Sequence, residues 1–124
     1  MTIERAAEAL ETALREIGEF AAAQSGLAAW SETFAKAAES LGANAPAAPY
    51  HPDILPPRGY SSRARQLLAA AVGAFVFGGM GSWNDLGFAE RKLQERYERL
   101  TKELYAAVMG GLVAAVNRGV SAGD

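Results

Sequence analysis

All five prolines of this 124-residue chain lie between positions 46 and 57, and this clustering constrains the fold more than any other feature. Proline interrupts a helix because it lacks a backbone N–H and its ring clashes with the preceding turn. Residues 43–60 also lack helical periodicity, so they are expected to form a connector. The flanking segments contain no proline and carry the apolar spacing of amphipathic helices. The sequence therefore predicts two helical halves joined by a proline-rich connector.

The composition favours helices over strands. Half of the residues are apolar and 27 are alanine, whereas valine and isoleucine, which strands prefer, are scarce. A chain of this length usually forms one domain, so residues 1–124 are predicted to be a single helical domain whose tail, 119–124, frays. The expected fold class is all-α: a three- or four-helix bundle with long first and last helices and a Pro-rich crossover loop.

The first half of the chain allows two interpretations. Thr2 has the residue type of an N-cap, and apolar residues recur at helical spacing after it. Gln24-Ser25-Gly26 has the composition of a turn, yet a seven-residue apolar ladder continues across it, and a turn has no reason to preserve helical register. Residues 2–42 are expected to form either one long helix, which would need a partner subunit, or two helices. The ladder consists of Ala6, Ala13, Phe20, Leu27, Phe34 and Leu41.

The connector, residues 43–60, is longer than the roughly 2 to 8 residues of typical loops between helices. In an extended polyproline conformation it could cover on the order of 50 Å, enough to cross the length of a bundle. The alternative is a lid, in which the large apolar side chains of the connector pack down over a groove. Those side chains are Tyr50, Ile54, Leu55 and Tyr60.

A helix and a glycine turn are expected directly after the connector. Ser61 or Ser62 can cap this helix, which is predicted to end near Phe77. Each glycine in a helix interior costs about 1 kcal/mol relative to alanine. The glycine-rich residues 78–82 are therefore predicted to form a tight turn.

The last helix has the strongest pattern in the sequence. Asn84 or Asp85 is expected to cap it, and charged i,i+4 pairs line its first half. Residues 104–117 carry no charge, so this half is expected to be buried on most sides. Gly110 and Gly111 would let another backbone come close.

Charge and composition exclude several classes of function. The formal net charge is −2 and the pI about 5.4, so no nucleic-acid partner is expected. The chain has no cysteine and no Glu-x-x-His pair, so no metal and no cofactor are expected. The charge-free runs 67–81 and 104–117 are shorter than the ~20 residues of a membrane-spanning helix. Because the first residues lack the pattern of a secretion signal, the protein is expected to be cytoplasmic.

The most distinctive stretch is the glycine turn and the residues after it. A turn that leads into a helix N-terminus exposes backbone N–H groups that can bind an anion, and an arginine can add a bidentate contact. The spacing does not match a phosphate-binding loop, which requires lysine where Gly79 stands. The alternative is a structural turn in which Trp83 fills the core. The candidate ligand-binding residues are Gly78, Gly79, Gly81, Ser82, Trp83, Asn84, Asp85 and Arg63.

No catalytic set emerges from the sequence. The single histidine, His51, lies in the connector, and nothing specifies it as part of a Ser-His-Asp arrangement. The expected function is therefore non-enzymatic: a helical oligomerisation or protein-interaction module that forms a homodimer, with another protein partner as a further option. The alternative is a small-ligand binding protein, with anions among the candidate ligands, that uses turn 78–85 as its pocket and the connector as its lid.

Overall fold

The computed structural model describes residues 2–43, 59–78 and 81–118, and these residues form a bundle of four α-helices. The first and last helices are the longest, with 21 and 28 residues, which confirms the predicted all-α bundle. The helices are α1 (Ile3–Ala23), α2 (Ala28–Ser40), α3 (Ser62–Gly73) and α4 (Arg91–Arg118), and a short 3-10 helix, η1 (Trp83–Asp85), precedes α4.

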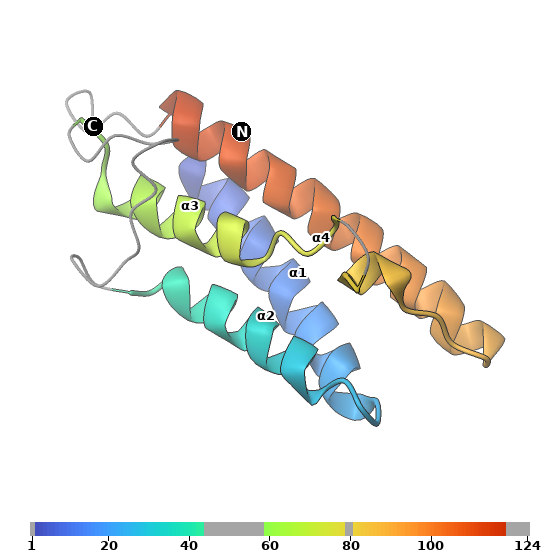
Figure 1. The fold of residues 1–124 in the computed structure, drawn as a ribbon. Coiled ribbons are helices and arrows are strands. Elements are labelled where there is room, and N and C mark those ends of the chain that lie inside the picture. Colours follow the sequence, from blue (N-terminus) through green and yellow to red (C-terminus); the bar gives the residue numbers. More distant parts are fainter. Residues whose placement is uncertain (1, 44–58, 79–80, 119–124) are drawn as a thin grey trace.

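Each helix runs antiparallel to the next one along the chain (Figure 1). Helix α1 packs against α2, α3 and α4, and α3 packs against both α2 and α4. The end of α2 and the start of α3 lie at the same end of the bundle (Figure 1). A hydrogen bond from the Gln66 side chain to the carbonyl of Ala43 joins these two helix ends. Residues 44–58 of the predicted connector lie outside the described residues.

Residues 2–42 form two helices, so of the two alternatives the one with a turn near Gly26 is correct and the single long helix is not formed. Helix α1 stops at Ala23, and Gly26 takes the left-handed backbone conformation, with φ of 84°, before α2 begins. The apolar ladder survives the turn because the two antiparallel helices direct its members into the same core. Phe20 of α1, Leu27 at the turn and Phe34 of α2 are all buried.

Two of the predicted helix caps are present. The Thr2 hydroxyl accepts a hydrogen bond from the Arg5 N–H at 3.1 Å, and the Ser61 hydroxyl accepts one from the Ala64 N–H at 3.1 Å. Each of these two hydroxyls satisfies an N–H group that the first turn of a helix leaves without a partner. Of the two serines proposed for α3, the cap is therefore Ser61.

The boundaries between α3 and α4 differ from the prediction. Helix α3 ends at Gly73 rather than near Phe77. Beyond it, the backbone N–H of Trp83 donates a hydrogen bond to the carbonyl of Val76. The expectation that Asn84 or Asp85 caps the last helix is wrong, because both belong to η1 and α4 begins only at Arg91. Their side chains instead bond back to the preceding turn, which stabilises η1 as a separate element.

Aromatic rings from three helices and from the segment between α3 and α4 form one cluster in the core. Neighbouring rings have centroids 5.1 to 6.4 Å apart, and most pairs meet edge to face or tilted, which is the favourable geometry for aromatic contacts. This cluster joins α1, α2 and α4 at the end of the bundle that holds the α1–α2 turn (Figure 1). Its members are Phe20, Trp30, Phe34, Trp83, Phe88 and Tyr97.

Burial raises the pKa of the Tyr97 phenol above its ordinary value of 10.0. Desolvation is the main cause; the carboxylates of Asp85 and Glu98 add to the rise, and a backbone hydrogen bond at Leu86 opposes it. The phenol O–H donates a hydrogen bond to the backbone carbonyl of Trp83. The folded state therefore favours the neutral phenol, because ionisation would place a negative charge in the aromatic cluster.

Gly26→Ala is expected to lower the free energy of unfolding by about 1–2 kcal/mol, because alanine is strained in the left-handed conformation. In one continuous helix the same change would raise it by about 1 kcal/mol, so urea unfolding reads the sign. Gly42→Ala is the control, since Gly42 lies at a helix end without a positive φ. A stabilised Gly26→Ala variant would contradict the turn.

The raised pKa of Tyr97 predicts a stability loss at alkaline pH. The stability that the neutral phenol contributes is fully present below about pH 10 and is lost as the pH rises through the folded-state pKa. Urea unfolding between pH 8 and 11 should therefore show a smaller alkaline loss in Tyr97→Phe than in wild type. Tyr105→Phe, at a tyrosine that is 48% exposed, should keep the full loss. Equal losses in both variants would refute this role for Tyr97.

Candidate functional site

Trp83, the largest of the predicted ligand-binding residues, points into the core. Its side chain is fully buried, and its indole N–H donates to the Thr101 hydroxyl at 2.8 Å. The Thr101 hydroxyl in turn donates to the carbonyl of Tyr97. The indole thus has its one polar group satisfied inside the bundle. This position corresponds to the structural alternative, in which Trp83 fills the core.

Two of the other described residues of turn 78–85, Asn84 and Asp85, bond to the turn itself or to the residue just before it, and the buried Ser82 hydroxyl has no hydrogen-bond partner within the described part of the chain. The Asp85 carboxylate accepts a hydrogen bond from the Gly81 N–H, and the Asn84 amide donates to the carbonyl of Phe77 at 3.0 Å. Ser82 precedes η1 as its N-cap residue, and Gly78 is exposed. A carboxylate at the Gly81 N–H occupies the donor that an anionic ligand would need. Gly79 lies outside the described residues.

Arg63 lies at the start of α3, whereas turn 78–85 follows its end. Ten residues of helix separate Arg63 from Gly73, which corresponds to roughly 15 Å. The Arg63 guanidinium donates to the Glu4 carboxylate at 3.0 Å and to the carbonyl of Leu41. It therefore ties α1, α2 and α3 together at the end of the bundle opposite the aromatic cluster. The structure does not bring Arg63 and the turn into one site.

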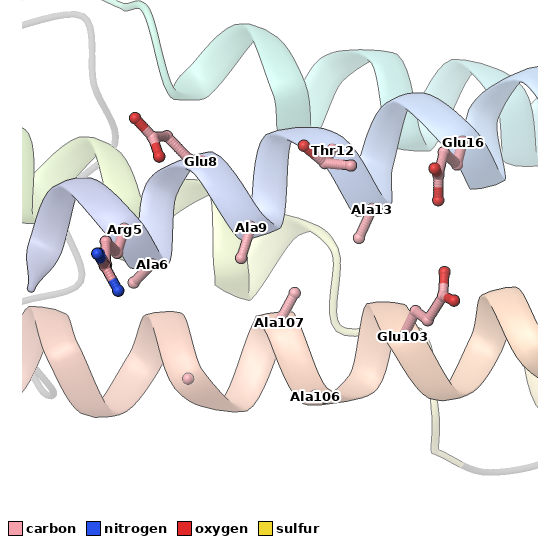
Figure 2. A pocket seen from close by; sticks show the side chains of 11 residues that line it. Arg5, Ala6, Glu8, Ala9, Thr12, Ala13, Glu16, Glu103, Ala106 and Ala107 are labelled. Atoms are coloured by element: carbon pink, nitrogen blue, oxygen red, sulfur yellow. The ribbon is translucent and has the colours of Figure 1, made fainter. Parts of the chain in front are cut away.

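A surface groove of about 770 Å³ runs between α1 and α4. The groove is shallow-sided because both helices place small side chains along it. Ala9 and Ala107 face each other across it (Figure 2). Arg5 lies at one end of the groove, and the carboxylates of Glu16 and Glu103 point toward each other at the other end (Figure 2). The lining residues are Arg5, Ala6, Glu8, Ala9, Thr12, Ala13, Glu16, Glu103, Ala106, Ala107 and Gly110.

Beside this groove, α4 carries a row of exposed apolar side chains, which we call the apolar stripe. Val113 is 56% exposed and Tyr105 is 48% exposed, values far above those of the core. The expectation that residues 104–117 are buried on most sides is therefore wrong for this chain alone, since only the opposite side faces the core. The stripe consists of Tyr105, Ala106, Met109, Val113 and Val116.

The first half of α4 shows what an ordinary solvent-facing surface of this helix looks like. At the same helical spacing of three and four residues, it exposes only charged side chains, which we call the charged stripe. One of them, Arg91, pairs with Glu95 at 3.1 Å. The character of the outer face changes from charged to apolar between Lys102 and Tyr105. The charged stripe consists of Arg91, Glu95, Glu98 and Lys102.

The two adjacent glycines of α4 serve different surfaces. A Cβ on Gly111 would lie 3.2 Å from the Leu67 Cδ1 atom, so glycine there allows α3 to pack close to α4. Gly110 lines the groove. The expectation of a close backbone approach thus applies inside the bundle, at Gly111. At Gly110 the missing side chain leaves the surface of α4 flat along the groove.

Sequence reasoning missed the groove and the apolar stripe as sites, although the signals for both were present. A helix that packs on one side needs apolar residues over roughly 100° of its circumference. Residues 104–117 carry them around the whole helix, which exceeds what its two neighbours, α1 and α3, can cover. The groove was signalled only by alanines at Ala6, Ala9 and Ala13 of α1, which are common on any tightly packed helix.

The fold and the site define a four-helix bundle with an apolar stripe on one helix. Comparison of the chain with protein-family models, with curated proteins and with solved structures finds no match. No helix among the described residues is both long enough and apolar enough to cross a membrane. Within the same residues, no group of three or more His, Cys, Asp or Glu side chains is placed to hold a metal ion.

Trp83→Ala is expected to lower the free energy of unfolding by about 3–5 kcal/mol, because it leaves a large cavity in the core and removes the bond to Thr101. Phe75→Ala is the matched control, since the Phe75 ring is 50% exposed and should cost less than about 1 kcal/mol. Urea unfolding followed by circular dichroism measures both. Similar small losses in the two variants would mean that Trp83 is not a core residue.

Proposed function

We propose that this chain is a helical protein-interaction module that associates with itself, as a homodimer, through the apolar stripe of α4. The observation that carries the proposal is the change of the outer face of α4 from charged to apolar within one continuous helix. The described surface of α1 keeps the ordinary pattern, with glutamates and arginines on its solvent side. Water therefore contacts apolar side chains on the second half of α4, although the first half of the same face carries charged side chains.

Covering the stripe would release free energy on a scale that matters for association. Full burial of one large aliphatic or aromatic side chain contributes about 1.5–3 kcal/mol. Four large side chains of the stripe are between 37% and 56% exposed, so each has a substantial part of that energy left to gain. Exposed apolar patches of this kind, bordered by polar residues, are typical of protein–protein interfaces.

The groove between α1 and α4 supports association through the same side of the molecule. It borders the apolar stripe, because Ala106 belongs to both. Small side chains there let a partner approach the α4 backbone closely, which increases the number of van der Waals contacts. Its rim is exposed and charged at Arg5, Glu8 and Glu103, as the polar border of an interface is.

The alternative, a small-ligand binding protein that uses turn 78–85 under a connector lid, stays a prediction. Both Gly79 and residues 44–58 of the lid lie outside the described residues. The described part of the turn directs Trp83 inward and satisfies the Gly81 N–H with Asp85, which argues for a structural role of these groups. A cytoplasmic location is likewise still a prediction.

Val113→Glu is expected to weaken self-association at least about tenfold, since it places a charge in the middle of the proposed interface, and tenfold corresponds to ~1.4 kcal/mol. The monomer should keep its stability because Val113 is 56% exposed. Native mass spectrometry and light scattering over a concentration series measure the dissociation constant.

Ala35→Glu is the matched control for this experiment. Ala35 is exposed on α2, away from the stripe, so the same charge there should leave association unchanged. The proposed function would be overturned if the wild-type chain stays monomeric at the highest concentration, or if Val113→Glu and Ala35→Glu dimerise as tightly as wild type.

A further inference from the structure

The arrangement of the second copy follows from how apolar and charged residues are distributed along α4. This inference rests on the proposed self-association and adds its geometry. In a symmetric dimer each copy uses the same surface, so the surface must be complementary to itself. Two copies of α4 can meet along the apolar stripe either parallel or antiparallel, and the two arrangements bring different side chains together.

A parallel arrangement would place identical residues of the two copies beside each other. The apolar stripe would be covered, but the charged stripe continues along the same face of α4 at the same spacing. Arg91 would then meet Arg91, and Glu95 would meet Glu95, in the second copy. Like charges held side by side destabilise an interface, so the parallel arrangement opposes itself over the first half of the helix.

An antiparallel arrangement covers the stripe without that repulsion. When the two apolar halves overlap, the two charged halves point away from each other and remain in water. The charge pattern of α4 therefore favours antiparallel association.

The spacing within the stripe is also symmetric. Four of its members are separated by three, four and three residues, so the stripe has the same spacing when it is read backwards. Alternating intervals of three and four are those of a helix–helix seam. With the two-fold axis level with Gly111, Met109 of each copy lies opposite Val113 of the other, and Ala106 lies opposite Val116. Each smaller side chain thus meets a larger one, as close packing requires.

We propose that a second copy of this chain packs antiparallel on α4, with the two-fold axis level with Gly111 and a seam of Ala106, Met109, Val113 and Val116. The seam lies over the part of α4 that has no charged residue. The occupant is a second copy because the same four residues supply both sides with matching spacing.

The test measures a distance between the two copies by pulsed electron spin resonance. The chain has no cysteine, so Lys92→Cys provides a single site for a spin label at an exposed position outside both stripes. Nineteen residues separate it from the axis level, so the antiparallel seam predicts a label separation of roughly 57 Å. A parallel seam predicts roughly 10–20 Å, because packed helices lie about 8–10 Å apart.

Cross-linking gives a second readout that needs no label. Disulfides form only between cysteines whose Cα atoms lie within about 7 Å. An equimolar mixture of Met109→Cys and Val113→Cys should therefore yield a cross-linked heterodimer under oxidation, and each variant alone should yield far less. Strong cross-linking of Met109→Cys alone would indicate a parallel seam and overturn the proposal.

The outcomes separate this inference from the proposed function. A dimeric mass with a distance near 57 Å supports both. A dimeric mass with a short distance retains self-association and overturns the antiparallel seam. A monomeric mass for the wild-type chain and the labelled variant overturns both. Circular dichroism of every cysteine variant must match wild type. If Lys92→Cys loses helix content, Arg96→Cys, also exposed on the first half of α4, replaces it as the label site, and the antiparallel seam then predicts roughly 45 Å.

Discussion

The burial of the Trp83 indole is the interaction on which the arrangement of the bundle depends. Trp83 belongs to the segment between α3 and α4 and not to any of the four helices, yet its ring contacts Trp30 and Phe34 of α2 and Tyr97 of α4. The hydrogen bond from the indole N–H to Thr101 orients the ring, and the Tyr97 hydroxyl donates to the backbone carbonyl of Trp83. The segment that follows α3 thus acts as part of the core, and this explains why α4 begins as late as Arg91.

The opposite end of the bundle is organised by a polar side chain. Arg63 bonds to Glu4 of α1 and to the carbonyl of Leu41 after α2, while Gln66 bonds to the carbonyl of Ala43. The last carbonyls of a helix lack partners within the helix, so side chains from α3 satisfy them. An aromatic cluster at one end and an arginine at the other hold three helices each, and the alanine-rich middle needs little more than close packing.

Helical periodicity was sufficient to predict the all-α fold and the caps Thr2 and Ser61, because these depend on local residue types. The break between α1 and α2 was left open, because Gly26 preserves the register of the buried residues on both sides. The end of α3 and the start of α4 were misjudged, since the bonds of Trp83 and Asn84 with Val76 and Phe77 are tertiary contacts. Nothing in a linear pattern reports them.

The candidate site was harder to predict for a related reason. Glycines and an arginine attract attention because ligand sites often use them, and here Asp85 and Glu4 already bond to these groups. The apolar stripe was visible in the sequence only as an uncharged half-helix, which a buried helix would also show. Deciding between the two requires knowing how many neighbours α4 has, and that is a property of the whole fold.

The aromatic cluster also determines what the intrinsic fluorescence of this protein can detect. The chain contains two tryptophans, and both belong to the cluster, with ring centroids 5.5 Å apart. Its tryptophan fluorescence therefore originates from a single place in the core. Val113 lies twelve residues beyond Thr101 along α4, or roughly 18 Å from the residue that holds Trp83. The tryptophan emission should therefore change when the bundle unfolds and stay nearly constant when a second copy binds to or leaves the apolar stripe of α4.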